Sequence, residues 1–134
     1  MLRGMAEPAL QSVQRVLVVD DYATMRRIVR NLLVQIGLTE VDEAASGASA
    51  LLKLREHGYD LVISDWNMVP MSGYELLKEV RADRHLRTLR FIMITAEGKT
   101  DNVAAAAAAG VNGYIVKPFT AETLRKKIEA VLAA

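Results

Sequence analysis

The residues that could carry chemistry stand at the carboxyl ends of short apolar runs. The run "VLVV" leads into two adjacent acids, "LVIS" leads into a third, and two later runs end in a hydroxyl and an ammonium group. In open α/β sheets, ligands bind beyond the carboxyl ends of the strands, which lie along one edge. We therefore expect one edge of a sheet to gather Asp20, Asp21, Asp65, Thr95 and Lys117.

Each of these residues also has an ordinary structural explanation. Asp21 is of the type that caps helices, Thr95 could be a plain strand residue, and Lys117 could be an exposed loop charge. For a single acid after a strand, the cap is the favoured interpretation. Polar residues of these types at four strand ends together are much less expected by chance than any one of them alone.

Three clustered acids need a compensating charge. Two unit charges ~4 Å apart repel by ~4 kcal/mol at an effective dielectric near 20. No His or Cys accompanies the acids, which disfavours zinc and copper. Oxygen ligands with open positions suit Mg²⁺, which also takes phosphate oxygens. The residues thus predict Mg²⁺ and a phosphoryl group, with Thr95 and Lys117 receiving the remaining phosphoryl oxygens.

Alternating segments must position these side chains. Apolar residues at helical spacing from Met25 to Ile36 predict a helix that stops at Gly37, with arginines on its other face. Further helices are expected between the later strands, so five strands alternate with five helices in a parallel sheet covered on both faces. The strands are expected at Val16–Val19, Leu61–Ser64, Phe91–Thr95 and Tyr114–Val116, with a charged edge strand at Glu40–Ala44.

The bulk composition restricts the class of protein. The 134 residues suit one domain, and 17 Lys and Arg nearly balance 16 Asp and Glu, so no nucleic-acid or membrane partner is expected. The absence of cysteine excludes disulfides and fits a reducing cytoplasm. No apolar run reaches the ~18 residues of a membrane span. Residues 1–13 are expected to form a flexible leader, with Met5 as an alternative start.

Several motifs together resemble the receiver domain of response regulators, and in particular its chemotaxis type. They are "VVDD", "TMRRIVRNLL", "VISDWNM", "TAE" and "GYIVKPFT", and the likeness covers residues 14–134. The resemblance implies a flavodoxin-like fold with strand order 2-1-3-4-5. It also implies a single-domain response regulator of two-component signalling, which is a phosphoprotein rather than an enzyme.

The resemblance assigns roles to the polar residues at the strand ends. Asp65 would be the phosphoacceptor, taking its phosphoryl group from a histidine kinase, and Lys117 and Thr95 would bind the phosphoryl oxygens. The Mg²⁺ ligands that it implies are Asp20, Asp21, Asp65 and the backbone carbonyl of Asn67.

The resemblance also implies an output surface and partners. Tyr114 would be the switch aromatic, and the surface around it would include Lys99, Val103, Ala107 and Val116. The implied partners are a chemotaxis-type histidine kinase, a phosphatase and the flagellar motor switch protein. The chain would act as a cytoplasmic monomer that controls flagellar rotation.

Some positions depart from the family pattern or carry less weight. The proline usually found four residues beyond the acceptor is replaced by Val69, with Pro70 next, and Ser72 replaces an acid or amide but still suits a helix cap. The Lys117–Pro118 bond resembles a cis peptide of the family. His57 and His85 are expected at the surface, without a metal.

Three alternative functions differ from this one in the residues or the output that they require. An aspartyl phosphatase of the haloacid-dehalogenase type wants a second acid two residues after its nucleophile, where this chain has Asn67. A flavin site on the same fold wants a Ser/Thr/Gly loop after the first strand, where "DDYATM" is acidic. A phosphorelay intermediate or phosphate sink shares the chemistry of Asp65 and differs only in its output.

Overall fold

The computed structural model describes residues 13, 15–96 and 100–133. Its strands form one five-stranded sheet in the order β2-β1-β3-β4-β5, and every neighbouring pair is parallel. The predicted strand order and fold class are therefore confirmed. The strands are β1 (Val16–Val19), β2 (Val41–Ala44), β3 (Leu61–Asp65), β4 (Arg90–Thr95) and β5 (Gly113–Val116).

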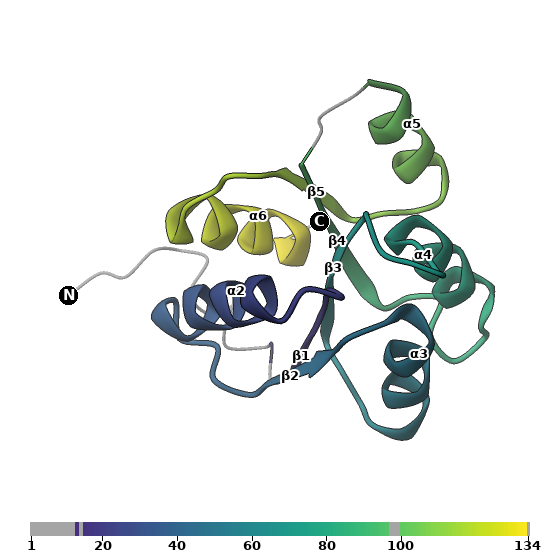
Figure 1. Cartoon of the computed structure of the whole chain (residues 1–134), viewed down its shortest axis with the longest axis horizontal. Coiled ribbons are helices and arrows are strands. Elements are labelled where there is room, and N and C mark those ends of the chain that lie inside the picture. The colour runs from purple at the N-terminus through teal and green to yellow at the C-terminus, as the bar shows by residue number, and fades with distance from the viewer. Residues whose placement is uncertain (1–12, 14, 97–99, 134) are drawn as a thin grey trace.

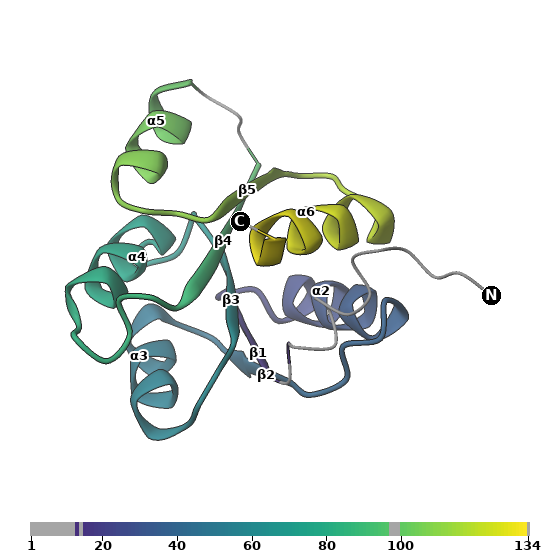
Figure 2. The same cartoon turned by 180° about the vertical axis from the view of Figure 1, so that it is seen from behind.

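Helices cover both faces of the sheet, as Figures 1 and 2 show from opposite sides. On one face lie α2 (Ala23–Gln35) and α6 (Ala121–Ala133). The other face carries α3 (Gly47–Glu56), α4 (Gly73–Ala82) and α5 (Thr100–Ala108).

The apolar strands divide their side chains between two hydrophobic clusters. In β1, Val16 and Val18 join the cluster that includes residues of α2 and α6, whereas Leu17 and Val19 join the cluster that includes residues of α3 and α4. Successive strand residues point to opposite faces, so a strand covered on both sides needs apolar residues throughout. This is why the central strands read as unbroken apolar runs.

Most of the predicted element limits agree with the structure. The helix predicted from Met25 to Ile36 is α2, and Gly37 after it has a φ of 97°, which favours glycine. Ile28 belongs to the apolar spacing that predicts this helix, yet 45% of the residue is exposed. The charged strand β2 lies at the sheet edge, as predicted, and β3 is one residue longer than expected because it includes Asp65.

The N-terminus of α4 is defined by a reciprocal cap. The Ser72 side chain accepts from the N–H of Glu75, and the Glu75 side chain accepts from the N–H of Ser72. The predicted capping role of Ser72 is thus confirmed. Val13 was assigned to the leader, but its side chain is buried in the α2–α6 cluster, and the rest of the leader lies outside the described residues.

Candidate functional site

The strand register brings the predicted site residues to one edge of the sheet. Val19 of β1 pairs with Ser64 of β3, so Asp20 and Asp65 come next on adjacent strands. On the other side of β3, Asp65 pairs with Ile94, the residue before Thr95. The chain after β5 then supplies Lys117 beside them.

Asp65 and Lys117 form the closest charged pair at this edge. Lys117 Nζ lies 2.8 Å from Asp65 Oδ1, and the side chains are 23% and 7% exposed. The contact does not have the direction of a hydrogen bond, so Asp65 Oδ1 is buried without a hydrogen-bond partner among the described residues. The ammonium group of Lys117 therefore compensates the charge of this buried oxygen, while its hydrogen-bonding capacity is left for another ligand.

Asp20 is a second buried acid next to the first. Only 5% of it is exposed, and its Oδ1 accepts a 2.9 Å hydrogen bond from the N–H of Tyr22. Burial raises the pKa of the Asp20 carboxyl, the Tyr22 N–H opposes this shift, and the negative charge of Asp65 adds to it. The positive charge of Lys117 acts in the opposite direction, but the pKa stays above its ordinary value, so a further cation near Asp20 would be favourable.

Asp21 is exposed at the rim of the site. It lines a hollow together with Trp66, Asn67 and Ser72. The N-cap of α2 is Tyr22, which makes no side-chain cap hydrogen bond, so Asp21 does not occupy the N-cap position. The structure thus buries two of the three predicted acids and leaves Asp21 at the surface.

The donor set fits a hard cation held by few protein ligands. In the part of the chain that the structure describes, no three His, Cys, Asp or Glu residues form a cluster that could hold a metal ion. Asp20 and Asp65 nevertheless offer two neighbouring carboxylates, one with a buried oxygen that lacks a hydrogen bond. Mg²⁺ commonly binds through one or two carboxylates and keeps several waters, so these residues suit it.

The residues predicted to carry the signal outward differ in their exposure. Thr95 is 1% exposed, and Tyr114 on β5 is partly buried beside Trp66. Val103 on α5 is 37% exposed, Val116 on β5 is 43% exposed, and Ala107 is also exposed. Lys99 lies outside the described residues.

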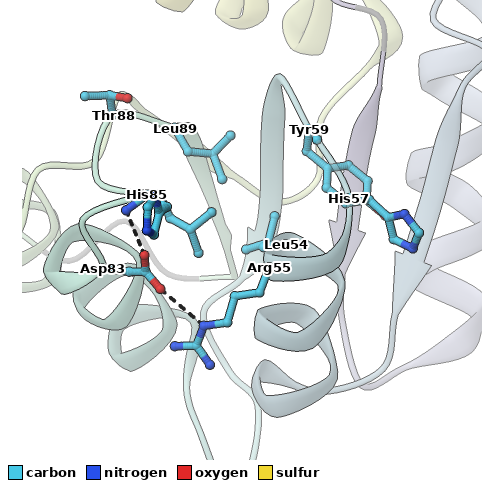
Figure 3. A pocket seen from close by; sticks show the side chains of 10 residues that line it. Leu54, Arg55, His57, Tyr59, Asp83, His85, Thr88 and Leu89 are labelled. Atoms are coloured by element: carbon cyan, nitrogen blue, oxygen red, sulfur yellow. Dashed lines mark hydrogen bonds and ion pairs between the residues drawn. The ribbon is translucent and has the colours of Figure 1, made fainter.

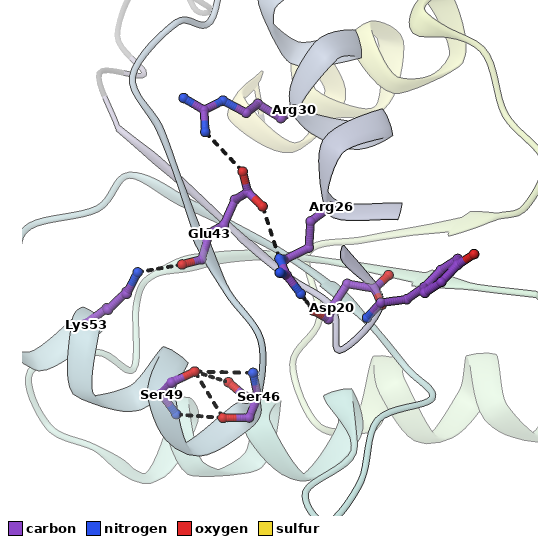
Figure 4. Close-up of polar contacts among 8 residues, drawn as sticks. Asp20, Arg26, Arg30, Glu43, Ser46, Ser49 and Lys53 are labelled. Carbon is purple, nitrogen blue, oxygen red and sulfur yellow. Dashed lines mark hydrogen bonds and ion pairs between the residues drawn. The ribbon is translucent and has the colours of Figure 1, made fainter. Parts of the chain in front are cut away.

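A hydrogen-bond network supports the backbone of Asp20 (Figure 4). The sequence analysis did not predict it, because Arg26 was expected only on the polar face of its helix. Arg26 Nη1 donates to the carbonyl oxygen of Asp20 at 2.7 Å, and Arg26 Nε donates to Glu43 Oε1 at 3.0 Å. Arg30 holds the other Glu43 oxygen at 3.0 Å. No spacing rule predicts these bonds, because they depend on where β2 lies.

Both arginines affect the pKa of the Glu43 carboxyl. Burial acts to raise its pKa, but hydrogen bonds from Arg30 and Arg26 outweigh this effect and lower the pKa. Lys53 also donates to the backbone carbonyl of Glu43 at 2.5 Å. The network joins the first loop of the site to β2 and to the start of α2.

The two histidines line a cavity that none of the site residues share (Figure 3). Both are exposed, as predicted, and the cavity of about 420 Å³ is also lined by Leu54 at the end of α3, by Tyr59, and by residues of the segment after α4. Within it, Arg55 Nε donates to Asp83 Oδ2 at 3.2 Å.

The Lys117–Pro118 peptide is cis, as the resemblance implied, and Val69–Pro70 is cis as well. Among the described residues, no helix has the length and apolarity needed to cross a membrane.

The family follows from a comparison with known proteins. The model of the response regulator receiver domain matches residues 16–129, and these include all the acids at the sheet edge. The chain therefore belongs to the response-regulator receiver family, whose members are phospho-accepting domains of two-component signalling.

The relatives agree with this assignment. The chain is 50% identical over 125 residues to chemotaxis protein CheY-3 of Vibrio cholerae serotype O1, covering 93% of this chain and 96% of the relative. It is also 50% identical over 117 residues to chemotaxis protein CheY of Pseudomonas aeruginosa, covering 87% and 94%.

Solved structures show the same fold. Chemotaxis protein CheY4 of Vibrio cholerae superposes with a TM-score of 0.83 at 37% identity, covering 89% of this chain and 98% of that one. A response regulator receiver domain protein of Clostridium thermocellum gives a TM-score of 0.81 at 30% identity, covering 90% and 95%.

Proposed function

We propose that this chain is a chemotaxis response regulator that accepts a phosphoryl group on Asp65 and then binds the flagellar motor switch protein. One observation carries the proposal: the buried Asp65 carboxylate lies at the sheet edge with its Oδ1 atom 2.8 Å from the ammonium group of Lys117, in an ion pair that is not supported by a hydrogen bond. The family match and the chemotaxis relatives support the same function.

Asp65 would be the nucleophile toward the phosphohistidine of a histidine kinase. A carboxylate oxygen of Asp65 forms a bond to phosphorus while the P–N bond breaks, and the electron pair stays on the imidazole nitrogen. The loose transition state of phosphoryl transfer mainly needs positioning and charge neutralisation. Lys117 already lies against the carboxylate, so its ammonium group would bind one phosphoryl oxygen, and the Thr95 hydroxyl would bind another.

Asp20 and Asp65 would hold Mg²⁺, with Asp21 and the backbone carbonyl of Asn67 at the exposed side. When bound, the ion supplies positive charge to the phosphoryl oxygens and compensates the acids. The raised pKa of Asp20, caused first by burial and reinforced by Asp65, supports a cation at this position.

The partner protein would bind at the surface formed by β5 and α5. Thr95 would turn toward the phosphoryl group and vacate space for the Tyr114 ring, which is a local packing change biased by phosphate contacts. Val103 and Val116 are exposed apolar residues on these elements, and they support docking of an amphipathic partner helix. The partner would be the N-terminal segment of the motor switch protein.

The acceptor is tested with Mg²⁺ and acetyl phosphate, followed by intact mass spectrometry. The wild type should gain one phosphoryl group, and borohydride reduction should convert position 65 to homoserine. Asp65→Asn should gain none, whereas Asp83→Asn, at the distant cavity, should behave as the wild type. Wild-type labelling of Asp65→Asn would disprove the assignment.

The partner is tested by measuring the binding of a motor switch N-terminal peptide with and without beryllofluoride and Mg²⁺. The phosphoryl mimic should strengthen binding, and Tyr114→Ala should weaken it without blocking phosphorylation. Equal binding in both states would favour a phosphorelay intermediate or a phosphate sink.

A further inference from the structure

Three aromatic rings connect the acceptor segment to the Tyr114 position. Trp66 directly follows Asp65, Tyr74 lies in the first turn of α4, and Tyr114 lies on β5. The Trp66 and Tyr74 rings are stacked, with centroids 5.3 Å apart and planes at 10°. The edge contact of Trp66 with Tyr114 has centroids 6.3 Å apart and planes at 70°. Both geometries are favourable for aromatic pairs.

The backbone holds the first two rings in place. The N–H of Trp66 donates to the carbonyl of Ile94 at 2.8 Å, and the carbonyl of Trp66 accepts from Gly73 at 2.9 Å. A Cβ on Gly73 would lie 2.1 Å from the carbonyl oxygen of Asp65, so α4 begins in direct contact with the acceptor. Tyr74 is therefore delivered to the indole by the same backbone that positions Asp65.

A cation also lies over the Tyr74 ring. Lys78, one helical turn after Tyr74, places its Nζ 5.1 Å from the centroid of the Tyr74 ring. A cation over an aromatic face at this distance is attracted to it. The indole is thus flanked by Tyr74 and Tyr114, and Tyr74 itself is covered by Lys78.

We propose that Tyr74 is a positioning residue of the output switch. By stacking on Trp66, it holds the indole in the place against which Tyr114 packs, and so it stabilises the arrangement of Tyr114 seen without phosphate. Weakening the stack should lower the cost of moving Tyr114, which raises the population of its alternative position. This inference rests on the proposed function, since it assumes that Tyr114 responds to phosphorylation of Asp65.

The position of Tyr114 can be measured directly by fluorine NMR. Tyrosine occurs four times in the chain, at 22, 59, 74 and 114. In a Tyr22→Phe, Tyr59→Phe background, both Tyr74→Phe and Tyr74→Leu leave Tyr114 as the single fluorotyrosine. Tyr74→Phe keeps the stacked ring, whereas Tyr74→Leu removes it, so the two proteins form a matched pair.

The expected result is a difference between the pair before any phosphoryl mimic is added. With beryllofluoride and Mg²⁺ defining the switched position, Tyr74→Leu should show a roughly 2- to 10-fold higher ratio of switched to unswitched Tyr114 than Tyr74→Phe. Lys78→Ala in the Tyr74→Phe protein should shift the ratio in the same direction by less. Trp66, the single tryptophan, should change its emission in Tyr74→Leu and keep it in Tyr74→Phe.

Two outcomes separate this inference from the proposed function. If both proteins take up one phosphoryl group from acetyl phosphate and their Tyr114 resonances coincide in both states, Tyr74 has no positioning role and the inference is overturned. If neither protein is labelled at Asp65, the proposed function fails and the inference fails with it. Should Tyr74→Leu not fold, the Lys78→Ala comparison decides by the same criterion.

Discussion

Arg26 holds Asp20 through the main chain rather than through the opposite charge of its carboxylate. Arg26 Nη1 donates to the Asp20 carbonyl oxygen at 2.7 Å, while Arg26 Nε is engaged by Glu43. Arg26 therefore fixes the loop that presents the acid and leaves both carboxylate oxygens of Asp20 to other partners.

Replacing Arg26 should loosen this loop and weaken Mg²⁺ binding. Partners that orient metal ligands typically change metal affinity by about 10-fold or more. We expect Arg26→Ala to lower the Mg²⁺ affinity about tenfold, measured by Trp66 fluorescence. Arg27→Ala removes the same charge from an exposed neighbour and should leave the affinity close to that of the wild type. Equal losses in the two variants would mean that charge, not positioning, is responsible.

Neutralising Asp20 should stabilise the metal-free protein. Burial and the nearby Asp65 disfavour its charge, and an amide at position 20 can still accept from the Tyr22 N–H. Asp20→Asn is expected to raise the free energy of unfolding on the order of 1 kcal/mol in urea with EDTA. Saturating Mg²⁺ should stabilise the wild type by roughly 2–4 kcal/mol at 100–1,000 times Kd, and the variant by much less.

Asp83→Asn is a control that should change the free energy of unfolding in the opposite direction. The N–H of His85 and the guanidinium of Arg55 lower the pKa of Asp83, so its charge is favoured in the folded state. Its neutralisation should therefore reduce stability. A stabilising Asp83→Asn alongside a destabilising Asp20→Asn would contradict the electrostatic account of the site.

Adding one methyl group at Gly73 should disrupt the site. The new Cβ would lie 2.1 Å from the Asp65 carbonyl oxygen and 2.9 Å from Met93 Sδ, so α4 would have to move. We expect Gly73→Ala to lower the free energy of unfolding by about 3 kcal/mol and to slow phosphorylation. Gly58→Ala, with no atom within 4 Å of its new Cβ, should stay within about 0.5 kcal/mol of the wild type.

Glu43 should contribute to stability in a defined pH window. Its folded-state pKa lies below the ordinary value of 4.5, so its contribution is present above about pH 4.5 and is lost as the pH falls through the folded pKa. Glu43→Gln should therefore be less stable than the wild type at pH 7, and the difference should shrink in acid. A difference that stays constant between pH 7 and pH 3 would mean that packing, rather than charge, accounts for it.

The central strands β1 and β3 were predictable because burial on both faces demands apolar residues along the strand. The end of β3 was harder to place. Asp65 looks like the residue after a strand because it is charged, yet its backbone still pairs with Ile94. The charged side chain belongs to the site, whereas the backbone of Asp65 belongs to the β3–β4 pairing.

The surroundings of the acids were less predictable than the acids themselves. Strand ends mark a site because parallel strands share one edge, so type and position alone pointed to Asp20 and Asp65. The direction of Arg26 depends on Glu43 in a strand far along the chain. The stack of Trp66 on Tyr74 depends on how the loop after β3 folds back, which residue spacing does not encode.

The proposed acceptor site brings together segments that are remote in the chain. Asp20 follows β1, Asp65 ends β3 and Lys117 follows β5, and β4 lies between β3 and β5, so the position of the lysine beside the carboxylate depends on both strand pairings of β4. A chain that has formed only its first three strands has both acids but lacks the lysine. If Asp65 accepts a phosphoryl group as proposed, its labelling during refolding should report when β1, β3, β4 and β5 have all assembled.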